Sequence, residues 1–110
     1  LNKKTGFEIV NLTPNPVTNE TAFLNITSAE KQTVTILVTD ASGKMVHSTV
    51  QPVIAGFTQV KLNFNNLATG VYTIAVYTNE GERKTVQFIK KMLYKIITIL
   101  SIMKVFKLSK

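Results

Sequence analysis

The chain of 110 residues is long enough for one domain that buries about two-thirds of its unfolded surface. With 45% hydrophobic and 17% charged residues, the composition excludes a disordered polypeptide. The absence of cysteine excludes disulfide bonds and thiolate metal sites. The net charge of +7 divides into +3 for residues 1–91, with nine Lys/Arg against six Asp/Glu, and +4 for the last nineteen residues. No basic cluster in the first part is interleaved with aromatic residues, so we expect no nucleic-acid binding. No glycine-rich phosphate loop or calcium loop is present, so we expect no cofactor.

Residues 1–6 are predicted to be the remnant of a linker, because the chain begins without a methionine or a signal-peptide pattern. The segment TPNP at 13–16 ends the first strand, because neither proline can donate a backbone hydrogen bond. The segment QPVIAG at 51–56 is predicted to be a break for the same reason. Runs with strand character occupy 7–10, 21–27, 33–40, 45–50, 58–64, 71–78 and 84–90.

Alternation within these runs predicts which side chains face the core. The predicted core positions are Ala22, Leu24 and Ile26, then Val34, Ile36 and Val38, then Val60, Leu62 and Phe64. Two tight hairpins are expected, one through Gly43 and one through the NEG segment at 79–81. Strands at spacings of about ten residues predict an all-β fold over residues 7–91, an immunoglobulin-like antiparallel β-sandwich of about seven strands. An up-and-down barrel is the alternative.

Residues 92–110 form an apolar tail whose only charges are lysines. Its lysine-free stretch IITILSIM covers only 96–103, well short of a bilayer core of about 30 Å at about 1.5 Å per helical residue. A helical tail would lie at an interface or against the sandwich, whereas an extended tail would be an aggregation hazard. One hypothesis makes the tail an anchor at a membrane surface. Another makes it foreign to the function.

No catalytic constellation is recognisable, so we expect a protein that is not an enzyme. His47 lies in a predicted strand, and the acidic residues fall mostly at turns, which is typical of solvated charges. Tyr72, Tyr77 and Phe57 are candidates for a platform that stacks sugars. Tyr72 and Tyr77 are five residues apart on one strand and therefore point to opposite faces. Three N-x-T sequons begin at Asn11, Asn19 and Asn25, and we assign them no role.

Five pieces in order resemble a known family. The pieces are an opening strand, a PNP segment, a GK pair after a turn, an L-x-x-G-x-Y segment and a lysine-ended last strand. They are similar to the type A C-terminal sorting domain of the Bacteroidetes type IX secretion system, over about residues 7–91. The residues that carry the resemblance are Pro14, Asn15, Pro16, Gly43, Lys44, Leu67, Gly70, Tyr72, Phe88, Ile89, Lys90 and Lys91.

The resemblance implies a non-catalytic signal carried at the end of an exported cargo. In such proteins the domain passes through the periplasm, is recognised by an outer-membrane translocon, and is removed at the cell surface by a sortase-like cysteine protease. The cargo domain would precede this domain in the same chain and would end on the cell surface or be secreted. The alternative is an immunoglobulin-like module that binds carbohydrate or protein through one sheet face.

Physical roles follow for the matched positions. We expect Pro14 and Pro16 to present Asn15 on a stiff loop, and Gly70 to permit a tight turn before Tyr72. A positive φ at Gly70 would make Gly70→Val cost about 1 kcal/mol or more. Lys90 and Lys91 are predicted to form a charged end of the last strand. The chain departs from the family at Thr13, where an aromatic or apolar residue is common. It also continues for nineteen residues beyond Lys91, a tail that could mask the signal.

Overall fold

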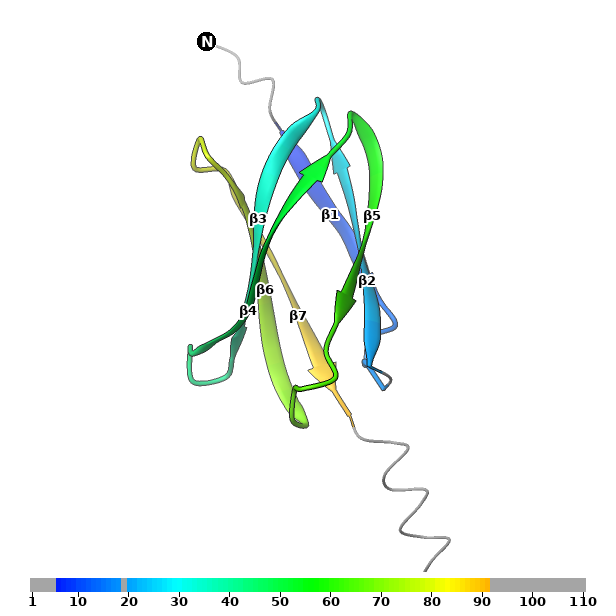
Figure 1. The fold of residues 1–110 in the computed structure, drawn as a ribbon, viewed down its shortest axis with the longest axis vertical. Coiled ribbons are helices and arrows are strands. Elements are labelled where there is room, and N and C mark those ends of the chain that lie inside the picture. The colour runs from blue at the N-terminus through cyan, green and yellow to red at the C-terminus, as the bar shows by residue number, and fades with distance from the viewer. Residues whose placement is uncertain (1–5, 19, 92–110) are drawn as a thin grey trace, which may run out of the picture.

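The computed structural model describes residues 6–18 and 20–91. Within them the strands are β1 (Phe7–Thr13), β2 (Thr21–Ser28), β3 (Gln32–Asp40), β4 (Met45–Val53), β5 (Gly56–Asn63), β6 (Gly70–Thr78) and β7 (Arg83–Lys90). They form two antiparallel sheets that face each other, sheet A with the order β1-β2-β5 and sheet B with the order β4-β3-β6-β7 (Figure 1). The predicted seven-stranded sandwich is confirmed and the barrel alternative is wrong. The predicted linker up to residue 5 and the tail 92–110 lie outside the described residues.

The core lies between the inner faces of the two sheets. All nine predicted core positions on β2, β3 and β5 and just after β5 are buried, at 5% exposure or less. Phe7, Tyr72, Ile74, Val76 and Phe88 complete the core from β1, β6 and β7. Period-two alternation was sufficient to find these residues, because each sheet has one covered face. No helix that could cross a membrane is found among the described residues.

Strand β4 is longer than the sequence predicts. The break expected from residue 51 begins only after Val53, and Pro52 pairs with Thr33 in the register of β3 and β4. Strand β4 is at the edge of sheet B, so the nitrogen of Pro52 need not donate to a further strand. Pro52 cannot donate a backbone hydrogen bond, but at an edge strand this does not end the strand, so the break predicted at residue 51 is wrong.

The strands β1, β3, β5 and β7 all end at the same end of the sandwich, where β7 stops at Lys90 (Figure 1). We call this end the C-terminal pole; it consists of the residues that follow these strands, 14–18, 41–44 and 64–69, together with Lys91. The β6–β7 turn lies at the opposite end. Both predicted hairpins are present, with Gly43 at φ 90° and Gly81 at φ 94°, a backbone conformation that glycine adopts without strain.

Candidate recognition site at the C-terminal pole

The PNP segment is attached to the last strand. Asn15 donates from Nδ2 to the carbonyl oxygen of Gln87 and accepts at Oδ1 from the N–H of Ile89, both at 3.2 Å. Two residues on, the N–H of Val17 donates to the carbonyl of Ile89 at 2.7 Å, and the N–H of Lys91 donates to the carbonyl of Val17 at 2.9 Å. Four hydrogen bonds therefore connect residues 15 and 17 to the outer edge of β7. The peptide bonds before Pro14 and Pro16 are both cis.

These contacts pair the end of β7 on both sides. Strand β6 lies along its inner edge, with Gly70 opposite Lys90, and Val17 forms a parallel bridge to Lys90 on the other side. The side chain of Val17 is fully buried in the core, which anchors the segment. An unpaired end of an edge strand would expose backbone donors and acceptors to pairing with other chains. Residues 15–17 cover this edge at the point where the chain leaves the domain.

A matched pair of asparagine variants tests this attachment. Asn15→Ala removes two side-chain hydrogen bonds to β7, so we expect it to lower the free energy of unfolding by about 1 to 2 kcal/mol. The amide of Ile89 loses its acceptor and should exchange its hydrogen faster. Asn66→Ala, at an exposed position of the same pole, should change stability by less than about 0.5 kcal/mol. Equal denaturant midpoints for the two variants, with unchanged exchange at Ile89, would show that the Asn15 contacts do not hold β7.

The four terminal residues of the described chain alternate between the interior and the surface. Phe88 is buried and Ile89 is exposed, as period two predicts. Lys90, however, is only 7% exposed, so the prediction of a charged end at both lysines is wrong for this residue. Its Nζ lies 3.4 Å from the carbonyl oxygen of Leu67, which faces it from the loop before β6. Of the two lysines at this end of β7, Lys91 is the exposed one.

Three aromatic rings stack beneath the pole. The ring of Phe88 lies parallel to that of Phe64, with centroids 4.9 Å apart, and to that of Tyr72, at 5.3 Å. The hydroxyl of Tyr72 donates to the carbonyl of Ala68 at 2.7 Å, which satisfies its polar group at the edge of the core. Leu67 packs against the same core. The predicted packing role of Tyr72 agrees with this arrangement.

Gly70 has no positive φ, so the strain expected for Gly70→Val does not arise there. A Cβ atom at this position would lie 3.8 Å from Cε1 of Tyr72, which is ordinary contact. The residue is the first of β6 and pairs with Lys90. Gly70 is therefore connected to the terminal strand by its pairing with Lys90, and not by an unusual backbone conformation.

The turn that contains Gly43 and Lys44 is organised by Asp40. One carboxylate oxygen of Asp40 accepts three hydrogen bonds at 2.7 to 3.0 Å. The donors are the hydroxyl of Ser42, the backbone N–H of Ser42 and the backbone N–H of Lys44. The Ser42 hydroxyl, followed by the Lys44 amide, lowers the pKa of Asp40 below its usual value. A shallow hollow of about 260 Å³ lies between this turn and residues 69–72. Lys44 is exposed beside it.

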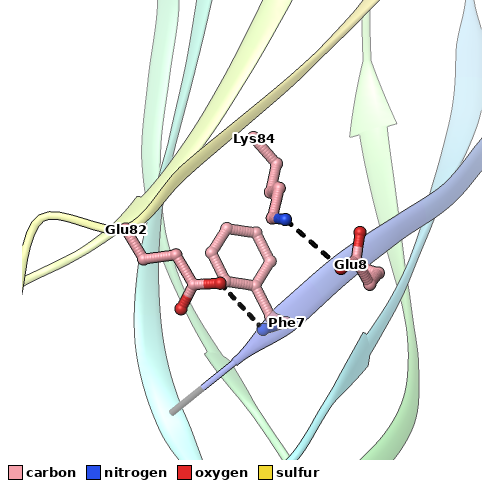
Figure 2. A network of polar contacts seen from close by, with 4 residues as sticks. All are labelled: Phe7, Glu8, Glu82 and Lys84. Carbon is pink, nitrogen blue, oxygen red and sulfur yellow. Dashed lines mark hydrogen bonds and ion pairs between the residues drawn. The ribbon is translucent and has the colours of Figure 1, made fainter. Parts of the chain in front are cut away.

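At the opposite end, side chains attach the beginning of β7 to β1 (Figure 2). The N–H of Phe7 donates to a carboxylate oxygen of Glu82 at 3.3 Å, and Lys84 pairs with Glu8 at 3.2 Å. The Glu8 side chain is 71% exposed, so the ion pair contributes little to stability. Together with Asn15 and Val17, these contacts place β7 beside the first strand and the loop after it. Sequence periodicity does not show them, because the partners are more than 70 residues apart.

The remaining candidates do not assemble into a site. Tyr72 is buried, Tyr77 lies half-buried on the outer face of sheet B, and Phe57 lies on sheet A, so they form no common platform for sugars. The ring of His47 packs edge-on against that of Phe64, with the ring centroids 6.4 Å apart. In the described part of the chain no cluster of three or more potential metal ligands occurs. Asn25, which begins one sequon, is 8% exposed and hydrogen-bonded within sheet A, and Asn19 lies outside the described residues.

Nearly all the residues singled out by the resemblance lie at or just beneath the C-terminal pole. The structure brings Asn15 onto β7, Lys90 beneath Leu67, and Tyr72 onto Phe88. Gly43 and Lys44 lie in the turn across the hollow from Gly70. Val17, which is fully buried and bridges to Lys90, is not among the residues that the sequence singles out. Its signal was available, since it is the first apolar residue after PNP, but nothing in the local pattern showed that it bridges to β7.

A family model described as the secretion system C-terminal sorting domain matches residues 11–91. The chain belongs to this family, the sorting domains of type IX secretion. A DUF3244-family protein from Bacteroides vulgatus with an immunoglobulin-like β-sandwich fold matches with 21% identity and a TM-score of 0.53, covering 78% of this chain and 100% of that one. CopC from Methylosinus trichosporium matches with 16% identity and a TM-score of 0.48, covering 77% and 91%. Comparison with curated proteins gives no significant match.

Family membership gives the domain a role as a secretion signal. It implies an interaction with the type IX secretion machinery, an upstream cargo, and export to the cell surface or into the medium. Domains of this family are in general non-catalytic. The similarity to the DUF3244-family structure supports the immunoglobulin-like fold.

Proposed function

We propose that this domain directs an upstream cargo across the outer membrane, and that the translocon recognises the folded C-terminal pole. The cargo would pass through the periplasm, and a sortase-like cysteine protease would then remove the domain at the cell surface. The domain would perform no reaction itself. The observation that supports the proposal most directly is that Asn15 and Val17 hold the end of β7, so residues from both ends of the domain meet on one surface.

Two exposed lysines mark this surface. Lys44 follows the turn at the pole and Lys91 ends the described chain, and both side chains are exposed. Lys90 is buried and supports the strand from within. We therefore assign contact with the secretion machinery to Lys44, Lys91 and the PNP segment. Phe88, Tyr72 and Gly70 would serve recognition only by maintaining the shape of the pole.

A reporter fusion tests the proposal. Residues 1–91 are joined to a fluorescent reporter that has an N-terminal export signal, in a host with the secretion system. We expect the reporter to reach the cell surface or the medium. Reversing both lysines at the pole, Lys44→Glu with Lys91→Glu, should leave most of the reporter in the periplasm. Reversing two exposed lysines elsewhere, Lys31→Glu with Lys61→Glu, changes the net charge equally and should not impair export.

Thermal melts of both double variants separate recognition from folding, because all four side chains are exposed. Periplasmic retention of the unaltered fusion, while a known sorting domain is exported in parallel, would refute the proposed function. Equal export by the two double variants would refute the assignment to the pole while leaving the sorting function intact. The alternative of a sugar-binding module is not favoured, because Tyr72, on which it depended, is buried.

A further inference from the structure

Strand β5 is an edge of sheet A and pairs with β2 on one side only. In an antiparallel pair, successive residues alternate between bonding the partner strand and pointing their N–H and carbonyl groups away from it. The N–H of Phe64 donates to the carbonyl oxygen of Glu20 at 2.6 Å, which fixes this alternation along β5. The backbone groups that point away from β2 therefore belong to four residues with exposed side chains, Phe57, Gln59, Lys61 and Asn63.

The other three sheet edges are obstructed. Asn15 and Val17 cover the end of β7. Pro52 removes a donor from the outer side of β4, and Glu82 accepts the hydrogen bond of the first N–H of β1. Among the described residues, no such backbone contact is found on the outer side of β5. This edge is therefore the one at which a further strand can pair most freely.

A row of side-chain amides leads to this edge across the outer face of sheet A. Asn25 donates from Nδ2 to Oδ1 of Asn11 at 2.6 Å, and Gln59 donates from Nε2 to Oδ1 of Asn25 at 3.0 Å. In the part of the chain that the structure describes, the row ends at Gln59. A side-chain amide has two donors and an acceptor oxygen, and the row uses one donor of Gln59. Another amide is the group best matched to the rest, because two amides can each donate to the oxygen of the other.

A second, antiparallel β5 supplies that amide when Gln59 lies opposite Gln59 of the other copy. In this register Phe57 lies opposite Lys61 of the second copy, with Cβ atoms about 5.5 Å apart, a distance at which cross-strand pairs interact. The ring of Phe57 is 54% exposed, so the aliphatic stem of the lysine covers it and the ammonium group is attracted to its face. A register centred on Lys61 would place two ammonium groups together. A register centred on Val60 would form neither the amide pair nor the contact between Phe57 and Lys61.

We propose that strand β5 pairs with β5 of a second copy of the chain, with Gln59 at the two-fold axis. The pairing extends sheet A across both copies and joins their rows of amides. The paired segment is 57–61, so the corner between β4 and β5 lies outside it. The self-complementary register is what selects a second copy over an unrelated strand, because the same residues serve as both partners. The pairing does not depend on the sorting function and uses none of the residues assigned to recognition.

Hydrogen exchange of individual amides, measured by NMR on the full chain, tests the pairing. The amides of Phe57, Gln59 and Lys61 point away from β2, so they should exchange more slowly as the protein concentration rises. With a Kd of about 0.1 mM, exchange should be about fourfold slower at about 1 mM than at about 10 μM. The amides of Val60 and Leu62 point toward β2 and should be protected equally at both concentrations. Association through any other surface would leave the first three amides unchanged.

Charge variants at one position test the register. Phe57→Glu places a carboxylate opposite Lys61 of the second copy and should keep the concentration dependence, whereas Phe57→Lys places two ammonium groups together and should abolish it. Val71→Glu and Val71→Lys, on sheet B, change the net charge by the same amounts and should both behave like the unaltered chain. Both positions are about half exposed, so all four variants should fold.

Three results would overturn the proposal. The first is exchange of the Phe57, Gln59 and Lys61 amides that is the same at both concentrations. The second is an equal response of Phe57→Glu and Phe57→Lys, which would exclude the register. The third is slower exchange only when a peptide of alternating threonine and valine is added, which would assign the edge to a strand of another protein.

Discussion

Phe88→Ala is expected to lower the free energy of unfolding by about 3 to 5 kcal/mol, the range for removing a buried phenylalanine. Phe88 is 1% exposed, and its ring stacks on both Phe64 and Tyr72. Removing it leaves a cavity under the pole and ends both stacking contacts. Chemical denaturation of residues 1–91, followed by circular dichroism, measures the loss. A domain of this size has a total stability of about 5 to 15 kcal/mol, so the loss removes a large fraction of the free energy of unfolding.

The adjacent residue provides the control. Ile89 is 43% exposed, and Ile89→Ala should cost about 1 kcal/mol or less because little buried volume is lost. Similar midpoints for Phe88→Ala and Ile89→Ala would contradict the stacked core under the pole. If Phe88→Ala also stops export of the reporter, its unfolding explains the failure. Only variants that remain folded report on recognition.

Lys90→Glu is expected to destabilise the domain by about 2 to 4 kcal/mol, whereas Lys91→Glu should change stability by no more than about 0.5 kcal/mol. The two lysines are neighbours, but Lys90 is buried at 7% exposure and Lys91 is exposed. The carboxylate introduced at position 90 would lose its water and would lie near the carbonyl oxygen of Leu67, which repels it. Thermal melts at neutral pH measure both variants.

Lys90→Met serves as the companion variant, because it keeps an unbranched side chain of similar length without the charge. It should retain most of the stability, since the buried stem of Lys90 is aliphatic. Lys90→Glu and Lys91→Glu with equal melting temperatures would mean that Lys90 reaches solvent. The end of β7 would then be the charged end that its sequence indicates.

The covered end of β7 belongs to a wider pattern at the sheet edges. Strand β1, at one edge of sheet A, has an irregularity between Ile9 and Asn11 in its pairing with β2, and such a bulge bends an edge strand. Pro52 removes a donor from β4 at one edge of sheet B. On β7, at the other edge of sheet B, residues 15–17 occupy the backbone groups around Ile89. These devices limit edge-to-edge association with other chains.

The sequence alone was sufficient for the seven strands, the core face of β2, β3 and β5, the hairpin glycine at 43 and the family. These depend on period-two alternation and on turn chemistry, which act between residues close in sequence. Only the tertiary structure decided that Pro52 lies inside an edge strand, that Lys90 is buried, that Gly70 is unstrained, and that Asn15 and Val17 hold β7. Each depends on a neighbour from a distant part of the chain, and the Asn15 contacts span 72 and 74 residues. Local patterns determine which face of a strand is buried, whereas the folded chain determines what lies beside its edge and its end.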